Sequence, residues 1–317
     1  VQRVRLTING IVQGVGFRPF VYTLAHNYGL KGFVLNDTTG VLIEAEGERE
    51  TLDRFVEAIR LRPPPNARIL SMTAENLPEA GYSSFVIQES RAPTGAGVQE
   101  KRVPISQDIA TCDDCLRELF DPTDRRYRYP FLNCTNCGPR YTIVKDVPYD
   151  RERTTMQVFP MCDPCKQEYH DPLDRRFHAQ PTACPFCGPM LTLTDRDGKS
   201  IECRDVIQEA CDLLKKGMVL GVKGIGGFHL ACNAGDDRAV RALRARKYRE
   251  DKPFALMAPD LEAVEEHCEV NDAEKALLMS KARPIVILRK KPSSTLSPQC
   301  APNQKTLGFM LPYTPLH

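Results

Sequence analysis

The sequence has no long hydrophobic run, and none of its apolar stretches approaches the ~18 residues that a membrane-spanning helix needs. It also has little excess of one charge: 43 basic and 41 acidic side chains leave a net charge of +2, which argues against a general polyanion binder. No basic segment followed by an apolar one, the pattern of a secretory signal, stands near residue 1. We therefore expect a protein without membrane contacts that resides in the cytoplasm.

Changes in composition divide the 317 residues into several parts, as expected for a length of two or three domains. Residues 1–90 are typical of a compact α+β domain, and residues 91–108, with several prolines and glycines, of a linker. Residues 109–190 form a cysteine-rich module, and residues 199–317 alternate helix and strand patterns typical of an α/β domain. The predicted fold class is therefore α+β multidomain.

Hydrophobic periodicity predicts the elements of the first domain. Val4, Leu6 and Ile8 alternate with polar residues, as in a half-buried strand. Pro19 suits the first position of a helix that ends near Gly29. The remaining predicted elements are strands at 33–35 and 41–43, a helix over 52–59, and closing strands at 69–72 and 85–87. This β-α-β-β-α-β order is the ferredoxin-like plan.

Eight of the 13 cysteines form four Cys-x-x-Cys pairs, separated by spacers of 18, 24 and 18 residues. The pairs are Cys112/Cys115, Cys134/Cys137, Cys162/Cys165 and Cys184/Cys187. Without a secretory signal, such a cluster favours metal binding over disulfides. A Cys-x-x-Cys turn presents two thiolates to one tetrahedral ion, so two such turns complete a closed structural zinc site. The sequence therefore predicts two structural Zn²⁺ sites.

The cysteine-rich module is an internal duplication: residues 112–139 and 162–189 are identical at 13 of 28 aligned positions without a gap. We expect two local Cys₄ sites, one in each repeat. A crossed pairing, of the first pair with the fourth and the second with the third, is the alternative. Disulfides, an iron–sulfur cluster and catalytic zinc are less favoured, the last because four thiolates leave no open coordination position.

The other histidines and cysteines of this part of the chain are given no metal role. His170 and His178 are expected to be surface residues, because eight thiolates already suffice for two ions. Five cysteines show no metal-binding spacing and are expected to be packed thiols: Cys203, Cys211, Cys232, Cys268 and Cys300.

A glycine-rich loop, residues 10–19 (GIVQGVGFRP), separates the first predicted strand from the first helix. Glycines there let backbone N–H groups converge on an anion, and the helix N-terminus adds its dipole. Arg18 supplies a planar guanidinium for phosphoryl oxygens. On this pattern alone, a tight turn beside a surface arginine is the alternative.

The whole loop closely resembles the signature of the acylphosphatase family, which has the same β-α-β-β-α-β order and needs an asparagine at the end of its second strand. Asn36 falls at that place, 18 residues after Arg18. The resemblance implies that Arg18 binds the phosphoryl group and that Asn36 orients the attacking water. With Arg18, the implied phosphate-binding residues are Gln13, Gly14, Val15, Gly16 and Phe17.

Two stretches of the last segment indicate a second anion site. Residues 223–230 (KGIGGFHL) are glycine-rich and follow a predicted strand, which is equally typical of a structural turn. Residues 246–254 (RKYREDKPF) are basic and follow a predicted helix, for which a solvated helix end is the alternative. Together they resemble the YrdC family, and His229 is expected to be structural. The resemblance implies ATP-phosphate contacts, with Mg²⁺ beside the triphosphate, for Lys223, Lys247, Arg249 and Lys252.

The order of the three parts resembles the HypF family, the carbamoyltransferases of nickel–iron hydrogenase maturation. The resemblance implies that the first domain hydrolyses carbamoyl phosphate to carbamate and phosphate. The YrdC-like domain would then couple carbamate to ATP as carbamoyl adenylate. The carbamoyl group would pass to the C-terminal cysteine of a HypE-type acceptor, towards the cyanide ligands of a hydrogenase iron.

Two other functions stay open on the sequence: a stand-alone acylphosphatase with a zinc docking module, and an RNA-linked YrdC-type protein, for which RNA binding is possible but not expected. The Ser-x-Asn motif that ends a YrdC domain does not occur before His317. We therefore expect an incomplete, truncated YrdC-like domain, with Val1 and His317 as fragment boundaries. Such a fragment is expected to keep phosphatase chemistry and zinc but not complete carbamoyl transfer.

Overall fold

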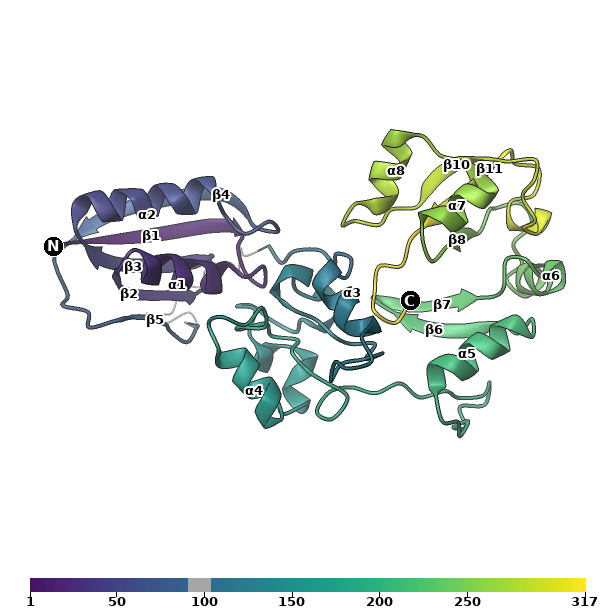
Figure 1. Cartoon of the computed structure of the whole chain (residues 1–317), viewed down its shortest axis with the longest axis horizontal. Coiled ribbons are helices and arrows are strands. Elements are labelled where there is room, and N and C mark those ends of the chain that lie inside the picture. The colour runs from purple at the N-terminus through teal and green to yellow at the C-terminus, as the bar shows by residue number, and fades with distance from the viewer. Residues whose placement is uncertain (91–103) are drawn as a thin grey trace. The chain divides into compact units, whose positions relative to one another are not determined.

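The computed structural model describes residues 1–90 and 104–317, so residues 91–103 of the expected linker lie outside the described residues. The chain forms two compact units, each described by itself (Figure 1). Unit 1 consists of Val1–Asp108 and Cys112–Pro189, and unit 2 of Ile109–Thr111 and Met190–His317.

Unit 1 begins with a five-stranded sheet in the order β4-β1-β3-β2-β5, in which only β5 runs parallel to its neighbour. Its elements are β1 (Gln2–Ile11), α1 (Phe17–Asn27), β2 (Lys31–Asn36), β3 (Val41–Gly47), α2 (Arg49–Leu61), β4 (Arg68–Leu77) and β5 (Phe85–Ile87). The core lies between the sheet and both helices, because alternate residues of β1 pack with one face of α1 and of α2. This confirms the predicted ferredoxin-like plan, and the strand predicted at 85–87 is β5, at the edge of the sheet.

The first helix begins two residues earlier than Pro19 predicts. Gly16 has a left-handed backbone (φ 76°) and caps the helix, so Phe17 is its first residue and Pro19 its third. Proline is tolerated there because the N–H groups of the first helical turn have no partner within the helix.

The cysteine-rich part of unit 1 contains two repeats with the same backbone. Each begins with a short helix directly after its first cysteine, α3 (Asp113–Phe120) and α4 (Asp163–His170). At matching positions Arg128 and His178 have positive φ angles of 56° and 52°. The 3₁₀ helices of this part are η1 (Thr135–Cys137), η2 (Tyr141–Ile143), η3 (Arg151–Arg153) and η4 (Thr155–Val158).

Unit 2 holds a hairpin of β6 and β7 and a four-stranded mixed sheet in the order β8-β11-β10-β9 (Figure 1). Its helices are α5 (Val206–Lys215), α6 (Asp237–Arg246), α7 (Leu261–His267), α8 (Asp272–Met279) and the 3₁₀ helix η5 (Pro298–Cys300). Its strands are β6 (Leu220–Gly224), β7 (Gly227–Ala231), β8 (Ala255–Met257), β9 (Cys268–Glu269), β10 (Val286–Lys290) and β11 (Thr306–Met310). Gly217 follows α5 and has the left-handed φ of 80° that favours a C-terminal cap.

Two of the cysteines that were predicted to be packed thiols, Cys268 and Cys300, belong to the core of unit 2. Cys211 is exposed on α5, so the prediction is wrong for that residue. No helix among the described residues is long and apolar enough to cross a bilayer.

Candidate functional site

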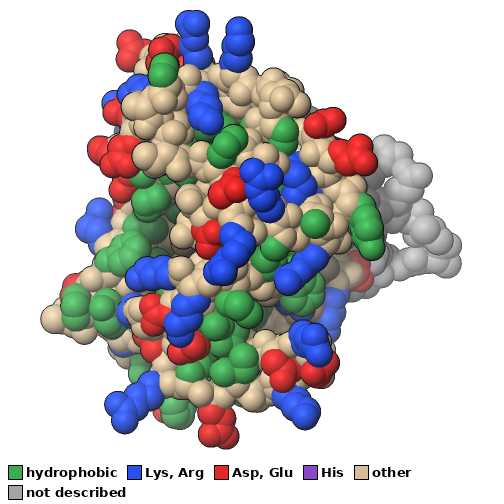
Figure 2. Space-filling view, turned by 90° about the vertical axis from the view of Figure 1, so that its right-hand side faces the viewer, with side chains coloured by type: hydrophobic (Ala, Val, Ile, Leu, Met, Phe, Trp, Pro, Cys, Tyr) green, Lys and Arg blue, Asp and Glu red, His purple; other side chains and the backbone are tan. Residues whose placement is uncertain are grey.

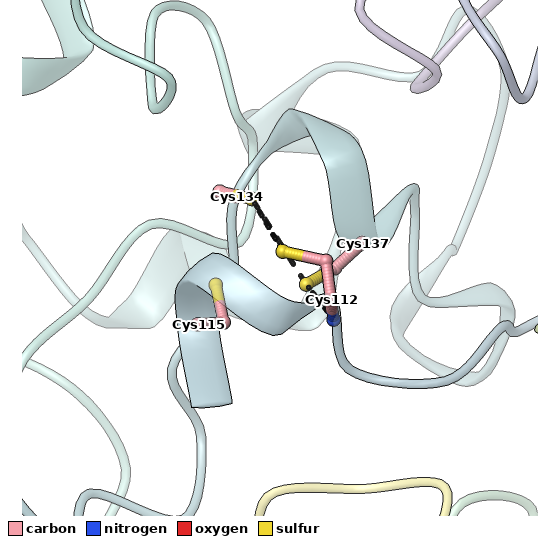
Figure 3. A group of neighbouring side chains, drawn as sticks. All are labelled: Cys112, Cys115, Cys134 and Cys137. Atoms are coloured by element: carbon pink, nitrogen blue, oxygen red, sulfur yellow. Dashed lines mark hydrogen bonds between the residues drawn. The ribbon is translucent and has the colours of Figure 1, made fainter. Parts of the chain in front are cut away.

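Two groups of four thiols lie in unit 1, one in each repeat. Cys112, Cys115, Cys134 and Cys137 form the first group (Figure 3), the first two from the start of α3 and the last two from η1. Cys162, Cys165, Cys184 and Cys187 form the second. Within each group all Sγ atoms lie within 4.8 Å of one another. The pairing is therefore local, as predicted, and the crossed alternative is wrong.

The sulfur positions fit a tetrahedral zinc ion. Zinc–sulfur bonds of about 2.3 Å place neighbouring thiolates about 3.8 Å apart. The Sγ–Sγ distances are 3.6 Å for Cys112–Cys134, 3.7 Å for Cys162–Cys184 and 3.6 Å for Cys187–Cys165. Four thiolates fill all positions of such an ion, so both sites suit structural rather than catalytic zinc.

Each repeat supplies two arginines to a glutamate of the other repeat. Arg126 donates to Glu168 from Nη1 at 3.0 Å and from Nη2 at 2.5 Å, and Arg125 Nη2 donates to Glu168 at 2.6 Å. In the reverse direction, Arg176 and Arg175 both pair with Glu118. The guanidinium groups of Arg126 and Arg176 are almost completely buried.

The same arginines reach the thiolates of the opposite metal site. Arg125 Nη2 lies 3.3 Å from Cys165 Sγ, and Arg175 Nη1 lies 3.0 Å from Cys115 Sγ. A zinc ion with four thiolates carries net negative charge, so these cations stabilise each loaded site from the other repeat. Burial alone would raise the pKa of Glu168, but the hydrogen bonds and charges of Arg126 and Arg125 lower it to about 2.

The predicted phosphate loop joins β1 to α1 and turns back on left-handed glycines at Gly14 (φ 72°) and Gly16 (φ 76°). The side chains of Val15 and Phe17 are buried in the core, so these residues can offer an anion only their backbone. The Gln13 amide donates to the carbonyl oxygens of Asp37 and Gly40, both at 2.8 Å. Its side chain is therefore a structural link to the turn between β2 and β3.

Arg18 and Asn36 meet at the end of this loop. Arg18 lies in the first turn of α1 and is 8% exposed, and Asn36 ends β2 and is 1% exposed. With its amide oxygen turned to the guanidinium, Asn36 accepts from Arg18 Nε at 3.1 Å and Nη2 at 3.2 Å. The structure thus brings together two residues that are 18 positions apart.

The cysteine-rich module contributes residues to this site that sequence reasoning missed. Asp150 Oδ1 accepts from Arg18 Nη2 at 2.9 Å, and Tyr149 N donates to Gln13 Oε1 at 2.9 Å. His178 lines the same cavity, so its prediction as a surface residue is wrong. Burial, with the charges of Arg18 and His170, lowers the pKa of His178 to about 4. No sequence signal marked these residues, because their role depends on contacts across more than 100 positions.

The predicted nucleotide contacts Lys247, Arg249 and Lys252 lie on one short segment after α6. A buried arginine that the sequence interpretation passed over, Arg244, holds this segment. Its Nη1 donates to the carbonyl oxygens of Arg249 at 2.8 Å and Lys252 at 3.2 Å. Its guanidinium also lies over the ring of Phe254, 4.4 Å from the centroid. The segment is therefore a positioned basic loop rather than a frayed helix end.

Lys223 lies on a different element, strand β6. Residues 223–227 form the turn end of the β6–β7 hairpin, and Lys223 lies 5.8 Å from the ring centroid of Phe228. His229 is exposed and lies 3.3 Å from Tyr313 Oη. On the face that Figure 2 shows, basic side chains of the described residues are interspersed with acidic and apolar ones.

Comparison with family models matches each part of the chain. Residues 4–87 match the acylphosphatase model, and residues 111–144 and 161–194 match the model described as HypF finger. Residues 212–317 match the Sua5/YciO/YrdC model, described as telomere recombination. The acylphosphatase of Thermotoga petrophila is 37% identical over 89 residues, which cover 28% of this chain and 98% of that protein.

These matches define the class: an acylphosphatase domain joined to paired Cys₄ zinc-finger modules and a YrdC-like domain. Carbamoyltransferase HypF of Synechocystis is 50% identical over 318 residues, covering 100% of this chain and 41% of that protein. A crystal structure of full-length HypF in the phosphate- and nucleotide-bound form superposes with a TM-score of 0.92 at 49% identity, covering 100% of this chain and 40% of that one. The chain belongs to the HypF family and spans about two fifths of the length of these relatives.

Proposed function

We propose that the chain carries the first two chemical steps of a cytoplasmic hydrogenase-maturation carbamoyltransferase. The observation that carries this proposal is the Arg18–Asn36 pair at the end of the phosphate loop. It is supported by 50% identity to Carbamoyltransferase HypF over the whole chain. We keep 1–90, 109–190 and 199–317 as the proposed domain boundaries.

In the first step, the phosphate loop and Arg18 bind the phosphoryl group of carbamoyl phosphate. Asn36 holds a water molecule in line with phosphorus, water oxygen bonds to phosphorus, and the bond from phosphorus to the carbamoyl oxygen breaks. The products are carbamate and inorganic phosphate. Backbone N–H groups and one guanidinium stabilise the charge of the transition state, so this step depends on positioning and electrostatics.

In the second step, a carbamate oxygen attacks the α-phosphorus of ATP, which gives carbamoyl adenylate and pyrophosphate. Lys247, Arg249 and Lys252 would contact the phosphates from the loop that Arg244 holds, and Lys223 would contribute from the hairpin. Bound Mg²⁺ would neutralise triphosphate charge. Transfer to a HypE-type acceptor is proposed for proteins of the relatives' full length, of which this chain spans about two fifths.

The test of the first step is phosphate release from carbamoyl phosphate by the purified, zinc-loaded chain. Arg18→Ala should lower kcat/KM by about 10²- to 10³-fold, the usual loss when one electrostatic contact to the transition state is removed. Arg49→Ala is the matched control, because Arg49 lies exposed on α2. Undiminished phosphate release by Arg18→Ala contradicts the site.

The test of the second step is pyrophosphate release that requires both carbamoyl phosphate and ATP, measured in the full-length protein. Lys252→Ala should raise the KM for ATP. The stand-alone acylphosphatase alternative predicts phosphate release with no ATP-dependent product.

A further inference from the structure

The zinc-finger module packs directly against the phosphate loop through several neighbouring residues. A Cβ atom at position 14 would lie 2.8 Å from Pro139 Cβ and 2.9 Å from the Tyr149 ring. A Cβ atom at position 16 would lie 3.3 Å from Thr135 Cβ. Position 14 therefore requires glycine for two reasons. Its backbone is left-handed, and any side chain there would collide with the finger module.

The finger module covers one side of the site. The cavity beside Arg18 and Asn36 is lined on its other side by Tyr149, His178 and Pro181 of the finger module. It offers about 20 Å³ to water-sized molecules, enough for about one or two of them. Tyr149 is 1% exposed, and its backbone is tied to Gln13. A buried ring held in this way is a fixed wall and does not swing aside as a surface side chain does.

Asp150 forms an ion pair with the guanidinium of Arg18 in this site. Its carboxylate is an anion that accepts a hydrogen bond from Nη2, as a phosphoryl oxygen would. A phosphoryl group that takes this place displaces the carboxylate and gains the space beside Arg18. The acyl end of the substrate would then lie against Tyr149 and His178, which line the cavity.

We propose that the finger module restricts the phosphatase site to acyl phosphates with an acyl group about as small as carbamoyl or acetyl, with Tyr149 and His178 as specificity-determining residues. This inference rests on the proposed function and deepens it. A benzoyl group has five more heavy atoms than a carbamoyl or acetyl group and should therefore meet the buried ring of Tyr149. The structure thus assigns a role to the module beyond metal binding: it sets the substrate size of a neighbouring site.

The test compares acetyl phosphate, carbamoyl phosphate and benzoyl phosphate as substrates of the zinc-loaded chain. The wild type should prefer acetyl over benzoyl phosphate by about 100-fold in kcat/KM, as expected for steric exclusion from a rigid pocket. Tyr149→Ala should reduce this preference at least about tenfold. Tyr141→Ala is the matched control, since Tyr141 lies in the same module but is 60% exposed, and it should keep the wild-type preference.

Tyr149→Ala could fail to fold, so His178→Gly provides a second opening of the pocket. The positive φ of His178, 52°, suits glycine, and the variant removes the imidazole without straining the backbone. Zinc content of two ions per chain verifies that each variant is folded. Equal efficiency of the wild type on acetyl and benzoyl phosphate overturns the size restriction alone. Failure to hydrolyse any acyl phosphate overturns the proposed function and this inference together.

Discussion

The two finger repeats share a metal framework but differ in what they present to their surroundings. Their helices, their positive φ angles and their arginine–glutamate exchange correspond position by position. At one corresponding position the second repeat places His178 in the cavity beside Arg18, where the first has Arg128. At another the first repeat places Thr135 beside Gly16, whereas Pro185 stands in the second. Both repeats therefore contain the metal ligands and the arginines that pair with the other repeat. They differ at these two positions, which contact the first domain.

Removal of zinc should break the shared framework and has the largest expected effect. Cys115→Ser and Cys165→Ser form a matched pair, because both thiols are buried and both accept hydrogen bonds from the opposite repeat. Each should lose one zinc ion and about 10–16 kcal/mol of metal-linked folding free energy at its site. Metal analysis and circular dichroism measure the loss. Two zinc ions retained in either variant would contradict the assigned ligands.

Loss of one buried arginine should break the exchange between the repeats. Arg126→Met removes the ion pair between Glu168 and its buried arginine, and Arg176→Met removes the corresponding ion pair of Glu118. Each should lower the free energy of unfolding by about 3–5 kcal/mol, and by similar amounts if the repeats are equivalent. Urea denaturation of the zinc-loaded chain gives both values. Arg117→Ala, at a side chain 73% exposed, is the control with a change near zero.

The difference between the repeats should appear in how the free energy of unfolding depends on pH. His178 of the second repeat contributes to this dependence, whereas the corresponding Arg128 does not titrate in this range. Its folded pKa of about 4 lies below the ordinary value, so the unfolded chain takes up a proton first as the pH falls. Stability from the neutral imidazole is complete above about pH 6.5 and declines by roughly 3 kcal/mol down to pH 4. Arg18, His170 and Asp150 are the charged groups that face it.

Denaturation of the wild type and His178→Gln from pH 7 to pH 4 isolates this contribution. The wild type should lose roughly 3 kcal/mol more stability than His178→Gln between pH 7 and pH 4, because glutamine does not titrate. Parallel curves would show that His178 titrates as an exposed histidine does.

The smallest expected effect concerns Asp150, in the segment between the repeats. Asp150→Asn removes the anion beside Arg18 while it keeps a hydrogen-bond acceptor. Inorganic phosphate should then bind several-fold to about tenfold more tightly, because it no longer displaces a charged partner. Competitive inhibition by phosphate measures the change. Weaker phosphate binding would instead assign Asp150 to the positioning of Arg18.

The fold was largely predictable where signals are local. The alternation of Val4, Leu6 and Ile8 and the stripe of the second helix gave the ferredoxin-like plan, because both patterns follow from the chain's own periodicity. The start of the first helix was placed two residues late, because Pro19 is allowed at several positions of a first turn. In unit 2, the strands β7, β9 and β11 were not predicted from the sequence, since short strands bounded by loops have little periodicity of their own.

The candidate site was predictable in its motif and not in its surroundings. Arg18 and Asn36 were identified from one loop and one strand end, and the structure brings them into contact. Asp150, Tyr149 and His178 lie more than 100 positions from that loop. One sequence alone does not show which distant residues come into contact on folding. Arg244 escaped for the same reason: its bonds to Gln299 join segments 55 positions apart.

The sequence by itself determined the chemistry that short spacings encode: four Cys-x-x-Cys turns, their duplication and one glycine-rich phosphate loop. Tertiary structure alone decided that the thiols pair within each repeat and that each repeat's arginines stabilise the other's site. It also decided that the module closes over the phosphate loop. The physical reason is that the spacing of two ligands within one turn is a local property of the sequence. Burial and charge pairing depend on which distant segments folding brings together.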